Sequence, residues 1–93
     1  MSVCRITTLT MKSKEGADAL VENYVSTAVS TFPEAEQLLQ IRADDTTVIA
    51  ISLYESNEAM KRADNARNKS IDSANDIASI DMKVGTVEIN HSK

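Results

Sequence analysis

The chain has 93 residues, of which 42% are hydrophobic, 26% charged and 3% aromatic, and its formal net charge is −4. This size and composition are typical of one soluble globular domain, which we expect to span residues 1–93. The acidic balance argues against a nucleic-acid partner, whose phosphates are bound by Lys and Arg, and no apolar run approaches the ~20 residues that cross a bilayer.

The few residues with redox or metal-binding chemistry set further limits. Cys4 is the only cysteine and His91 the only histidine, so the sequence predicts neither a disulfide within the chain nor a metal site. The first residues lead directly into a predicted strand and lack the apolar core of a signal peptide. We therefore expect a cytoplasmic protein without a metal cofactor.

The first half of the chain predicts a strand followed by a helix. Alternating apolar and β-branched residues favour a strand over 3–11. A polar turn over 12–16 follows, and the charge of Asp18 suits the first turn of a helix. Pro33 ends that helix, because the residue before a proline is disfavoured in the α conformation. Apolar residues recur with the spacing of one helical stripe at Ala17, Leu20, Val21, Tyr24, Val25, Ala28, Val29 and Phe32.

Two strands joined by an Asp44-Asp45 turn follow, one starting at residue 35 or 36 and ending at 43, the other over 46–55. The later strand is apolar on both sides. One side holds Val48, Ala50, Ser52 and Tyr54, and the other holds Thr47, Ile49, Ile51 and Leu53. Such a pattern indicates a central strand that is covered above and below.

The second half repeats this order less regularly. A helix is predicted to begin after Ser56 or Asn57, either of which can cap it. The stretch 68–80 keeps helical spacing, Ala74 included, but it contains many weak helix formers, so we expect a break and a second short helix near Ser70. The last strand is predicted over 82–90, with Gly85 marking a bulge or a close backbone approach.

The resulting order, β-α-β-β-α-β, predicts an α+β ferredoxin-like fold with a four-stranded antiparallel sheet and helices on one face. The other face of the sheet would meet water. Since the central strand is apolar on that side as well, we expect the chain to pair as a homodimer through the open sheet face.

The passage Tyr54-Glu55-Ser56-Asn57-Glu58-Ala59 resembles a recurring aromatic-x-Ser-x-Glu-Ala pattern of the antibiotic biosynthesis monooxygenase-like domains. Lys14-Glu15-Gly16 and Phe32-Pro33 also lie where these domains carry a polar helix start and a helix-ending proline. In element order the resemblance covers nearly the whole chain. It implies a dimeric α+β barrel, in which two sheets pack face to face and a pocket lies between each sheet and its helices.

The resemblance implies a cofactor-independent monooxygenase-like protein that acts on or binds a small aromatic or apolar molecule. Two departures weigh against catalysis: Ala63 stands where several relatives carry a histidine, and the chain has no tryptophan. A non-catalytic small-molecule-binding or dimerisation module of the same fold is therefore the alternative. An amino-acid-sensing regulatory domain of this topology also remains open.

The polar groups that suit such a pocket are Tyr24 on the first helix and Asn65 and Asn68 on the second, and these are the candidate catalytic residues. Each has a simpler interpretation. Tyr24 lies on the core stripe, where its hydroxyl needs only a partner, and helical asparagines are commonly exposed. We expect Tyr54 to pack at the sheet edge and His91 to be a solvated residue of the C-terminal tail.

Other charged and thiol groups are expected to be structural. A buried Arg5 or Arg42 would need a carboxylate or an anionic ligand, so we expect both to reach a sheet edge or a dimer salt bridge. Cys4 is interpreted as a small buried hydrophobe. A solvated face of the second helix is predicted from Lys61, Arg62, Arg67 and Lys69.

Overall fold

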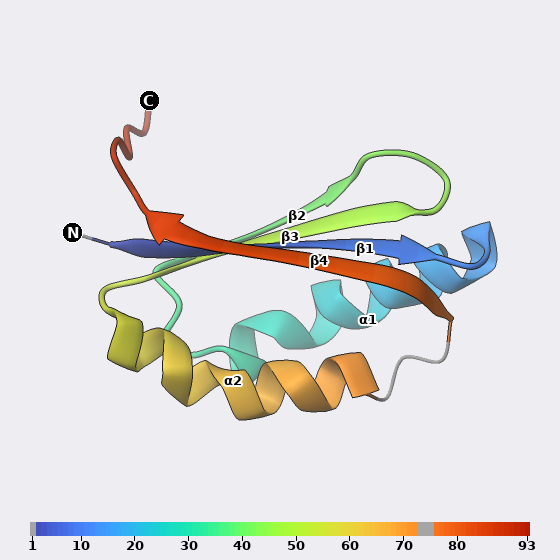
Figure 1. The fold of residues 1–93 in the computed structure, drawn as a ribbon, viewed down its shortest axis with the longest axis horizontal. Coiled ribbons are helices and arrows are strands. Elements are labelled where there is room, and N and C mark those ends of the chain that lie inside the picture. The colour runs from blue at the N-terminus through green and yellow to red at the C-terminus, as the bar shows by residue number, and fades with distance from the viewer. Residues whose placement is uncertain (1, 73–75) are drawn as a thin grey trace.

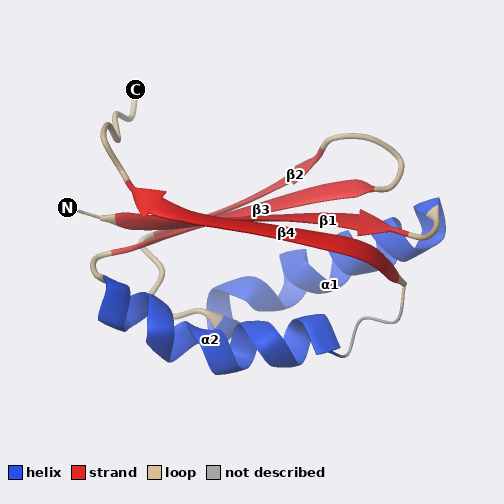
Figure 2. Ribbon diagram, viewed as in Figure 1, coloured by secondary structure: helices blue, strands red, loops and turns tan. Residues whose placement is uncertain are grey.

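The computed structural model describes residues 2–72 and 76–93. Its elements are β1 (Val3–Met11), α1 (Lys14–Thr31), β2 (Gln37–Arg42), β3 (Thr47–Tyr54), α2 (Asn57–Asp72) and β4 (Ile77–Thr86). The strands form one antiparallel sheet in the order β2-β3-β1-β4. Both helices lie on the same side of it (Figure 1), so the layers are one of sheet and one of helix (Figure 2). The predicted ferredoxin-like α+β fold is confirmed.

Local signals fix the ends of α1. The Ser13 hydroxyl accepts a hydrogen bond of 2.9 Å from the Gly16 N–H, which caps the helix. The polar turn predicted over 12–16 and the position of Asp18 indicated a later start of this helix. The helix begins at Lys14 instead. It ends at Thr31, shortly before Pro33, in agreement with the sequence.

The buried face of α1 is narrower than the predicted stripe. Ala17 and Ala28 are buried against the sheet, but Val25 and Val29 are 72% and 80% exposed. These two valines lie on the side of α1 that is next to β2, which is one of the two edge strands of the sheet. Since no further strand extends beyond β2, nothing in the described chain covers them.

The face of the sheet away from the helices is apolar along its centre. Ile6, Ile51 and Leu39 lie opposite one another on β1, β3 and β2, and Ile49 and Ile41 form part of the next row. Residues opposite one another on neighbouring strands point to the same face. Ile6, Leu39 and Ile41 are 40%, 44% and 42% exposed. The open apolar face predicted from the third strand is thus present.

The stretch between α2 and β4 differs from the prediction. α2 continues through Ser70 to Asp72, and β4 begins at Ile77, inside the segment predicted as a short helix. Ala74, which completed the helical spacing there, lies outside the described residues. Pairing with β1 outweighs local helical spacing, because propensity is a weak guide once a strand has a neighbour to join.

β4 is also shifted relative to the predicted last strand. It ends at Thr86, and the chain then extends away from the sheet on the side opposite the helices (Figure 1). Gly85 pairs in regular register with Cys4, whereas the irregularity lies between Thr10 and Met11 on β1. The bulge predicted at Gly85 is therefore elsewhere, where β4 begins.

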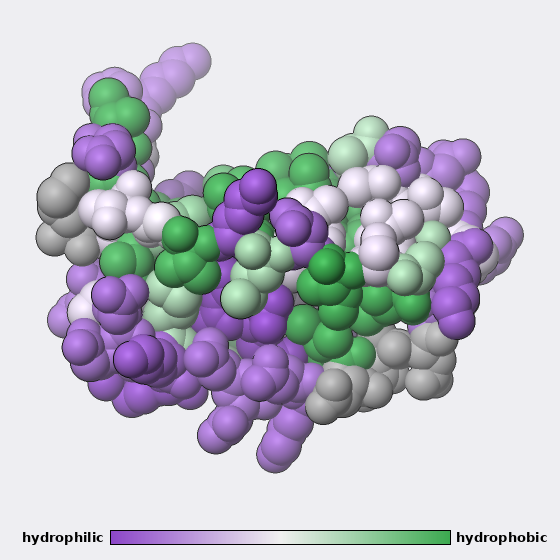
Figure 3. All heavy atoms as spheres, viewed as in Figure 1, coloured by the Kyte–Doolittle hydropathy of each residue, from purple (hydrophilic) through white to green (hydrophobic). Residues whose placement is uncertain are grey.

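β4 carries three apolar side chains that the two helices leave partly exposed. Their positions opposite Arg5, Thr7 and Leu9 place them on the helix-facing side of the sheet. Each is about half exposed, and Figure 3 shows hydrophobic surface along this side of the molecule above hydrophilic surface of the helix layer. The residues concerned are Ile80, Met82 and Val84.

The core between sheet and helices consists of two clusters. One includes Phe32, Tyr54 and Met60, and the other is centred on Leu9 and Val48. Neither helix in the described ranges has the length and apolar character needed to cross a membrane. Residues from both clusters surround the space between them, which is where the candidate site lies.

Candidate functional site

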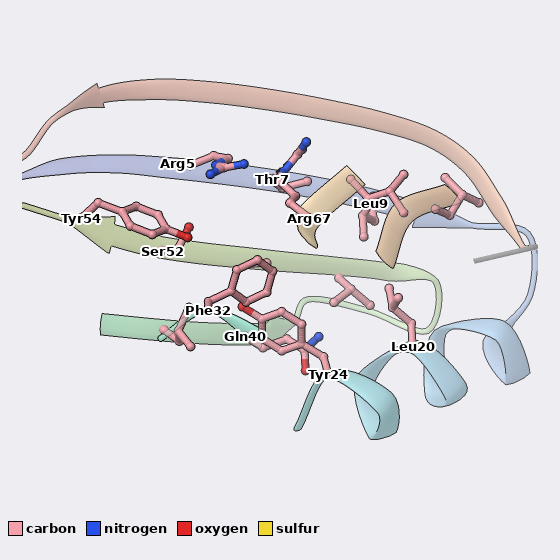
Figure 4. Close-up of a pocket in the computed structure, with 15 residues that line it drawn as sticks. Arg5, Thr7, Leu9, Leu20, Tyr24, Phe32, Gln40, Ser52, Tyr54 and Arg67 are labelled. Carbon is pink, nitrogen blue, oxygen red and sulfur yellow. Dashed lines mark hydrogen bonds between the residues drawn. The ribbon is translucent and has the colours of Figure 1, made fainter. Parts of the chain in front are cut away.

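A cavity of about 80 Å³ lies between the sheet and the two helices (Figure 4). Leu9 and Leu20 lie at one end, and Tyr54 at the other. A dry apolar cavity of about 150 Å³ takes up one benzene molecule, so a space of this size limits a ligand to a single ring at most. Its walls are mostly apolar, with a small set of polar groups, as is usual for a small-molecule site.

Strand alternation explains which polar groups face this cavity. Arg5 and Thr7 lie two residues apart on β1 and so point to the same face, as do Ser52 and Tyr54 on β3. Figure 4 shows Arg5 and Thr7 across the cavity from Tyr24 on α1. The sheet and the helix layer thus each supply polar groups to one space.

Arg5 is buried in this site with only 3% of its surface exposed. One nitrogen forms a 3.0 Å ion pair with Asp64 of α2, another donates to the Met60 carbonyl at 3.2 Å, and the guanidinium lies 5.7 Å from the centre of the Tyr54 ring. The prediction that Arg5 reaches a sheet edge was wrong. β1 lies inside the sheet, so this side chain has no edge to reach and takes a carboxylate from α2 instead.

Arg42 behaves as predicted, because β2 is an edge strand. It forms a 2.9 Å ion pair with Asp18 and donates to the backbone carbonyls of Asp44 and Asp45. The hydrogen bond from Arg42, followed by that from Lys14, lowers the pKa of the Asp18 carboxyl. This cluster lies at the rim of the fold and stabilises the β2–β3 turn.

Tyr24, the first candidate catalytic residue, lines the cavity. Its ring lies 6.4 Å from that of Phe32 in a tilted arrangement. Burial raises the pKa of the Tyr24 phenol, proximity to Tyr54 raises it further, and Arg5 partly offsets both. The hydroxyl is therefore protonated at neutral pH, and it is suited to donate a hydrogen bond rather than to accept a proton.

Asn65 and Asn68, the other two candidates, are both exposed on α2 and do not line the cavity. With 3.6 residues per turn, positions four apart share a face, so buried Ala63 is followed on the sheet side by Arg67 and Ile71. The structure thus brings Tyr24 into the site and leaves the two asparagines outside it. Their catalytic role stays a prediction.

Arg67 is the residue of this site that sequence reasoning missed. It was assigned to a solvated face of α2, but it lines the cavity and donates to the Thr7 hydroxyl at 3.3 Å and to the Asn68 side chain at 3.4 Å. Burial lowers the pKa of its guanidinium, and the positive charge of Arg5 lowers it further. The sequence did contain a signal for this position. Arg67 lies four residues after Ala63 and four before Ile71, which places it on the same side of the helix as these two residues.

The remaining reactive side chains lie apart from the cavity. Cys4 is partly buried on the open face of the sheet, and burial raises the pKa of its thiol, which disfavours the reactive thiolate. His91 is exposed in the C-terminal tail, as predicted. Among the described residues, no group of His, Cys, Asp and Glu side chains is arranged to hold a metal ion.

No protein-family model matches the sequence, and no curated protein matches it at a significant level. Solved structures do share its fold. ActVA-Orf6, a monooxygenase of Streptomyces coelicolor solved in complex with nanaomycin D, superposes with a TM-score of 0.75 at 14% identity, covering 99% of this chain and 92% of that one.

Two further structures are similar. A Chloroflexus aurantiacus protein assigned as an antibiotic biosynthesis monooxygenase gives a TM-score of 0.78 at 14% identity, over 99% of this chain and 98% of that one. A dimeric ferredoxin-like protein from an uncultured marine organism gives a TM-score of 0.73 at 8% identity, over 99% of this chain and 92% of that one. The predicted resemblance to antibiotic biosynthesis monooxygenase-like domains is confirmed at the level of fold.

Proposed function

We propose that this protein is a cofactor-independent, monooxygenase-like protein that binds a small aromatic molecule in the cavity between its sheet and helices. The observation that carries the proposal is the mostly apolar cavity between sheet and helices, with the Tyr24 hydroxyl at its wall. The shared fold with the Streptomyces coelicolor monooxygenase supports it. Fold alone does not determine activity, so the proposal depends on the cavity.

A reaction of this kind draws its electrons from the substrate. A phenol that ionises to a stabilised anion is oxidised by O₂ at the ring carbon opposite its hydroxyl. One oxygen atom becomes the new quinone carbonyl, the other leaves as water, and the two hydrogens of that water come from the ring carbon and the phenol. Atoms and electrons balance without a cofactor.

The protein would contribute positioning and exclusion of water. The apolar walls hold the ring, and the protonated Tyr24 hydroxyl donates a hydrogen bond to a substrate oxygen. As negative charge builds on that oxygen, such a donor stabilises it. Of the three candidate catalytic residues, Tyr24 is the one on which this proposal depends.

The test is oxygen uptake with a panel of phenols, hydroquinones and anthrones, beginning with the single-ring members that fit the cavity. We expect Tyr24→Phe to lower the uptake rate roughly tenfold or more, because it removes one hydrogen-bond donor to the developing anion. Ser30→Ala, an exposed change on the same helix, should leave the rate unchanged. Absence of uptake across the panel would contradict the catalytic part of the proposal.

One observation favours the alternative of a non-catalytic binding module. The 15 described residues that line the cavity include neither a histidine nor a carboxylate, so none of them is an obvious acceptor for the substrate proton. A rise in melting temperature with phenols that cause no oxygen uptake would support this alternative. A dimer with neither ligand binding nor uptake would leave dimerisation as the only function.

We also propose that the protein forms a homodimer through the open sheet face. The apolar rows of β1, β2 and β3 support this, since large exposed apolar patches mark interaction surfaces. The similarity to a dimeric ferredoxin-like protein supports it as well. In such a pair the helices and both cavities lie on the outside, so ligand binding does not compete with pairing.

A further inference from the structure

The charges at the cavity do not balance. Two guanidinium groups line it, those of Arg5 from β1 and Arg67 from α2. The only carboxylate bonded to either of them among the described residues is Asp64, which is 49% exposed and pairs with Arg5. Thr7, the hydrogen-bond partner of Arg67, lies two residues from Arg5, roughly 7 Å along the strand. Both positive charges therefore lie near the same part of the cavity.

Arg67 is held only weakly where it lies. Its hydrogen bonds to Thr7 and Asn68 measure 3.3 and 3.4 Å, at or beyond the long end of the usual range, and both acceptors are uncharged. Arg62 on the same helix gives the contrast. It makes three hydrogen bonds of 2.7 to 3.0 Å with the Glu34 carboxylate. In the described part of the chain, Arg67 thus lacks the kind of partner that Arg62 has.

Two buried polar atoms at the cavity have no partner among the described residues. They are the Nε of Arg5, a residue only 3% exposed, and the Oε1 of Gln40. Both residues line the cavity. A buried polar atom without a hydrogen bond destabilises the fold. The Arg5 Nε–H is a donor that a carboxylate oxygen satisfies, whereas the Gln40 Oε1 is an acceptor and needs a donor such as water.

We propose that the cavity takes a single-ring aromatic carboxylate, whose anionic group is bound by Arg5 and Arg67 and whose ring packs against the apolar wall around Leu9 and Leu20. Guanidinium groups bind carboxylates through charge-assisted hydrogen bonds, which are shorter and stronger than those to neutral acceptors. The inference rests on the proposed function, that the cavity is a small-molecule site, and adds the charge of the ligand. The end of the cavity at Leu9 and Leu20, opposite Tyr54, offers only apolar contacts for the ring (Figure 4).

The test compares benzoate with benzamide, a neutral molecule of the same shape, by calorimetric titration of the wild-type protein. We expect benzoate to bind roughly tenfold or more tightly than benzamide, since a hydrogen bond to a charged group outweighs one to a neutral group by that factor. Arg67→Gln should weaken benzoate binding by a similar factor and weaken benzamide binding much less, so that the ratio of the two affinities falls. Arg62→Gln, on the exposed side of the same helix, should change neither.

The outcomes separate this inference from the proposed function. Equal binding of benzoate and benzamide, or an Arg67→Gln protein that retains full benzoate affinity, would overturn the anionic ligand and leave an aromatic site standing. Absence of binding for benzoate, benzamide and phenol alike would overturn both proposals. If Arg67→Gln fails to fold, the wild-type ratio of benzoate to benzamide affinity decides the matter alone.

Discussion

Arg5 and Asp64 join the two layers of the fold through a 3.0 Å ion pair, in which a central strand supplies the cation and α2 supplies the carboxylate. Arg67 lies three residues after Asp64 on the same helix and lines the same cavity. The contact that holds α2 on the sheet therefore also determines where the second guanidinium lies. Stability and the proposed ligand binding thus involve the same turn of helix.

The first prediction concerns this ion pair. Asp64→Asn leaves the buried Arg5 cation without its carboxylate, so the free energy of unfolding should fall by about 1–3 kcal/mol, less than for a fully buried pair because Asp64 is half exposed. Urea denaturation followed by circular dichroism measures the change. Asp81→Asn, an exposed change on β4, is the matched control. Equal stability of the two variants would show that the pair contributes nothing.

The second prediction compares the two glycines of the chain. A Cβ at Gly16 would overlap the side chain of Asp76, which accepts a hydrogen bond from the capping residue Ser13. Moving Asp76 away breaks that link between the start of α1 and the residue before β4. Gly16→Ala should therefore destabilise the protein by about 1–2 kcal/mol, because overpacking outweighs the gain of roughly 1 kcal/mol in helix propensity.

Gly85→Ala is the control for that change. A Cβ at Gly85 would meet no atom within 4 Å, so this substitution should leave stability unchanged or raise it slightly through the entropy of the unfolded chain. Thermal unfolding of both variants measures the difference. A Gly16→Ala protein as stable as Gly85→Ala would mean that Asp76 moves aside at no cost.

Much of the fold follows from local sequence signals. β1 has the predicted bounds, and β3 differs by one residue at each end, because strict alternation and the Asp44-Asp45 turn act over a few residues. The segment after Ser70 is different. Ile77 and Ala78 fit either a helix or a strand by spacing, and only the availability of β1 as a neighbour decides between them.

The site was predicted only in part, for a similar reason. Tyr24 lies on a helical stripe that the sequence shows directly, and it lines the cavity. The burial of Arg5 depends on β1 having a strand on each side and α2 above it, which is information about partners distant in sequence. Arg67 was assigned by its charge to the solvated face, although its spacing from Ala63 and Ile71 places it on the sheet side.

The third prediction concerns the ionisation of Tyr24. Burial raises the pKa of its phenol, so the difference between the alkaline absorbance titrations of the wild type and Tyr24→Phe should have a midpoint above the ordinary value of about 10. A raised pKa means that the folded state retains this proton longer than the unfolded chain. Its contribution to stability is therefore complete below the unfolded pKa and is lost as pH rises through the folded one.

The same titration tests the role assigned to Tyr24 in the proposed reaction. A midpoint at or below the ordinary value would mean that Arg5 stabilises the phenolate more than burial disfavours it. Tyr24 would then be suited to accept a proton, and its role as a hydrogen-bond donor would be wrong. Addition of benzoate should raise the midpoint further, because a nearby anion disfavours the phenolate.

The last prediction tests pairing through the open sheet face, at whose centre Ile51 lies opposite Ile6 and Leu39. In a homodimer this position loses its water, and a charge without a partner is costly there. Light scattering should give wild-type protein twice the chain mass of 10.1 kDa, and Ile51→Lys the mass of a single chain. Val29→Lys, at a position 80% exposed on the helix layer, should keep the wild-type mass. A folded wild-type protein of single-chain mass at micromolar concentration would contradict pairing, while leaving the cavity and its two arginines as they are within one chain.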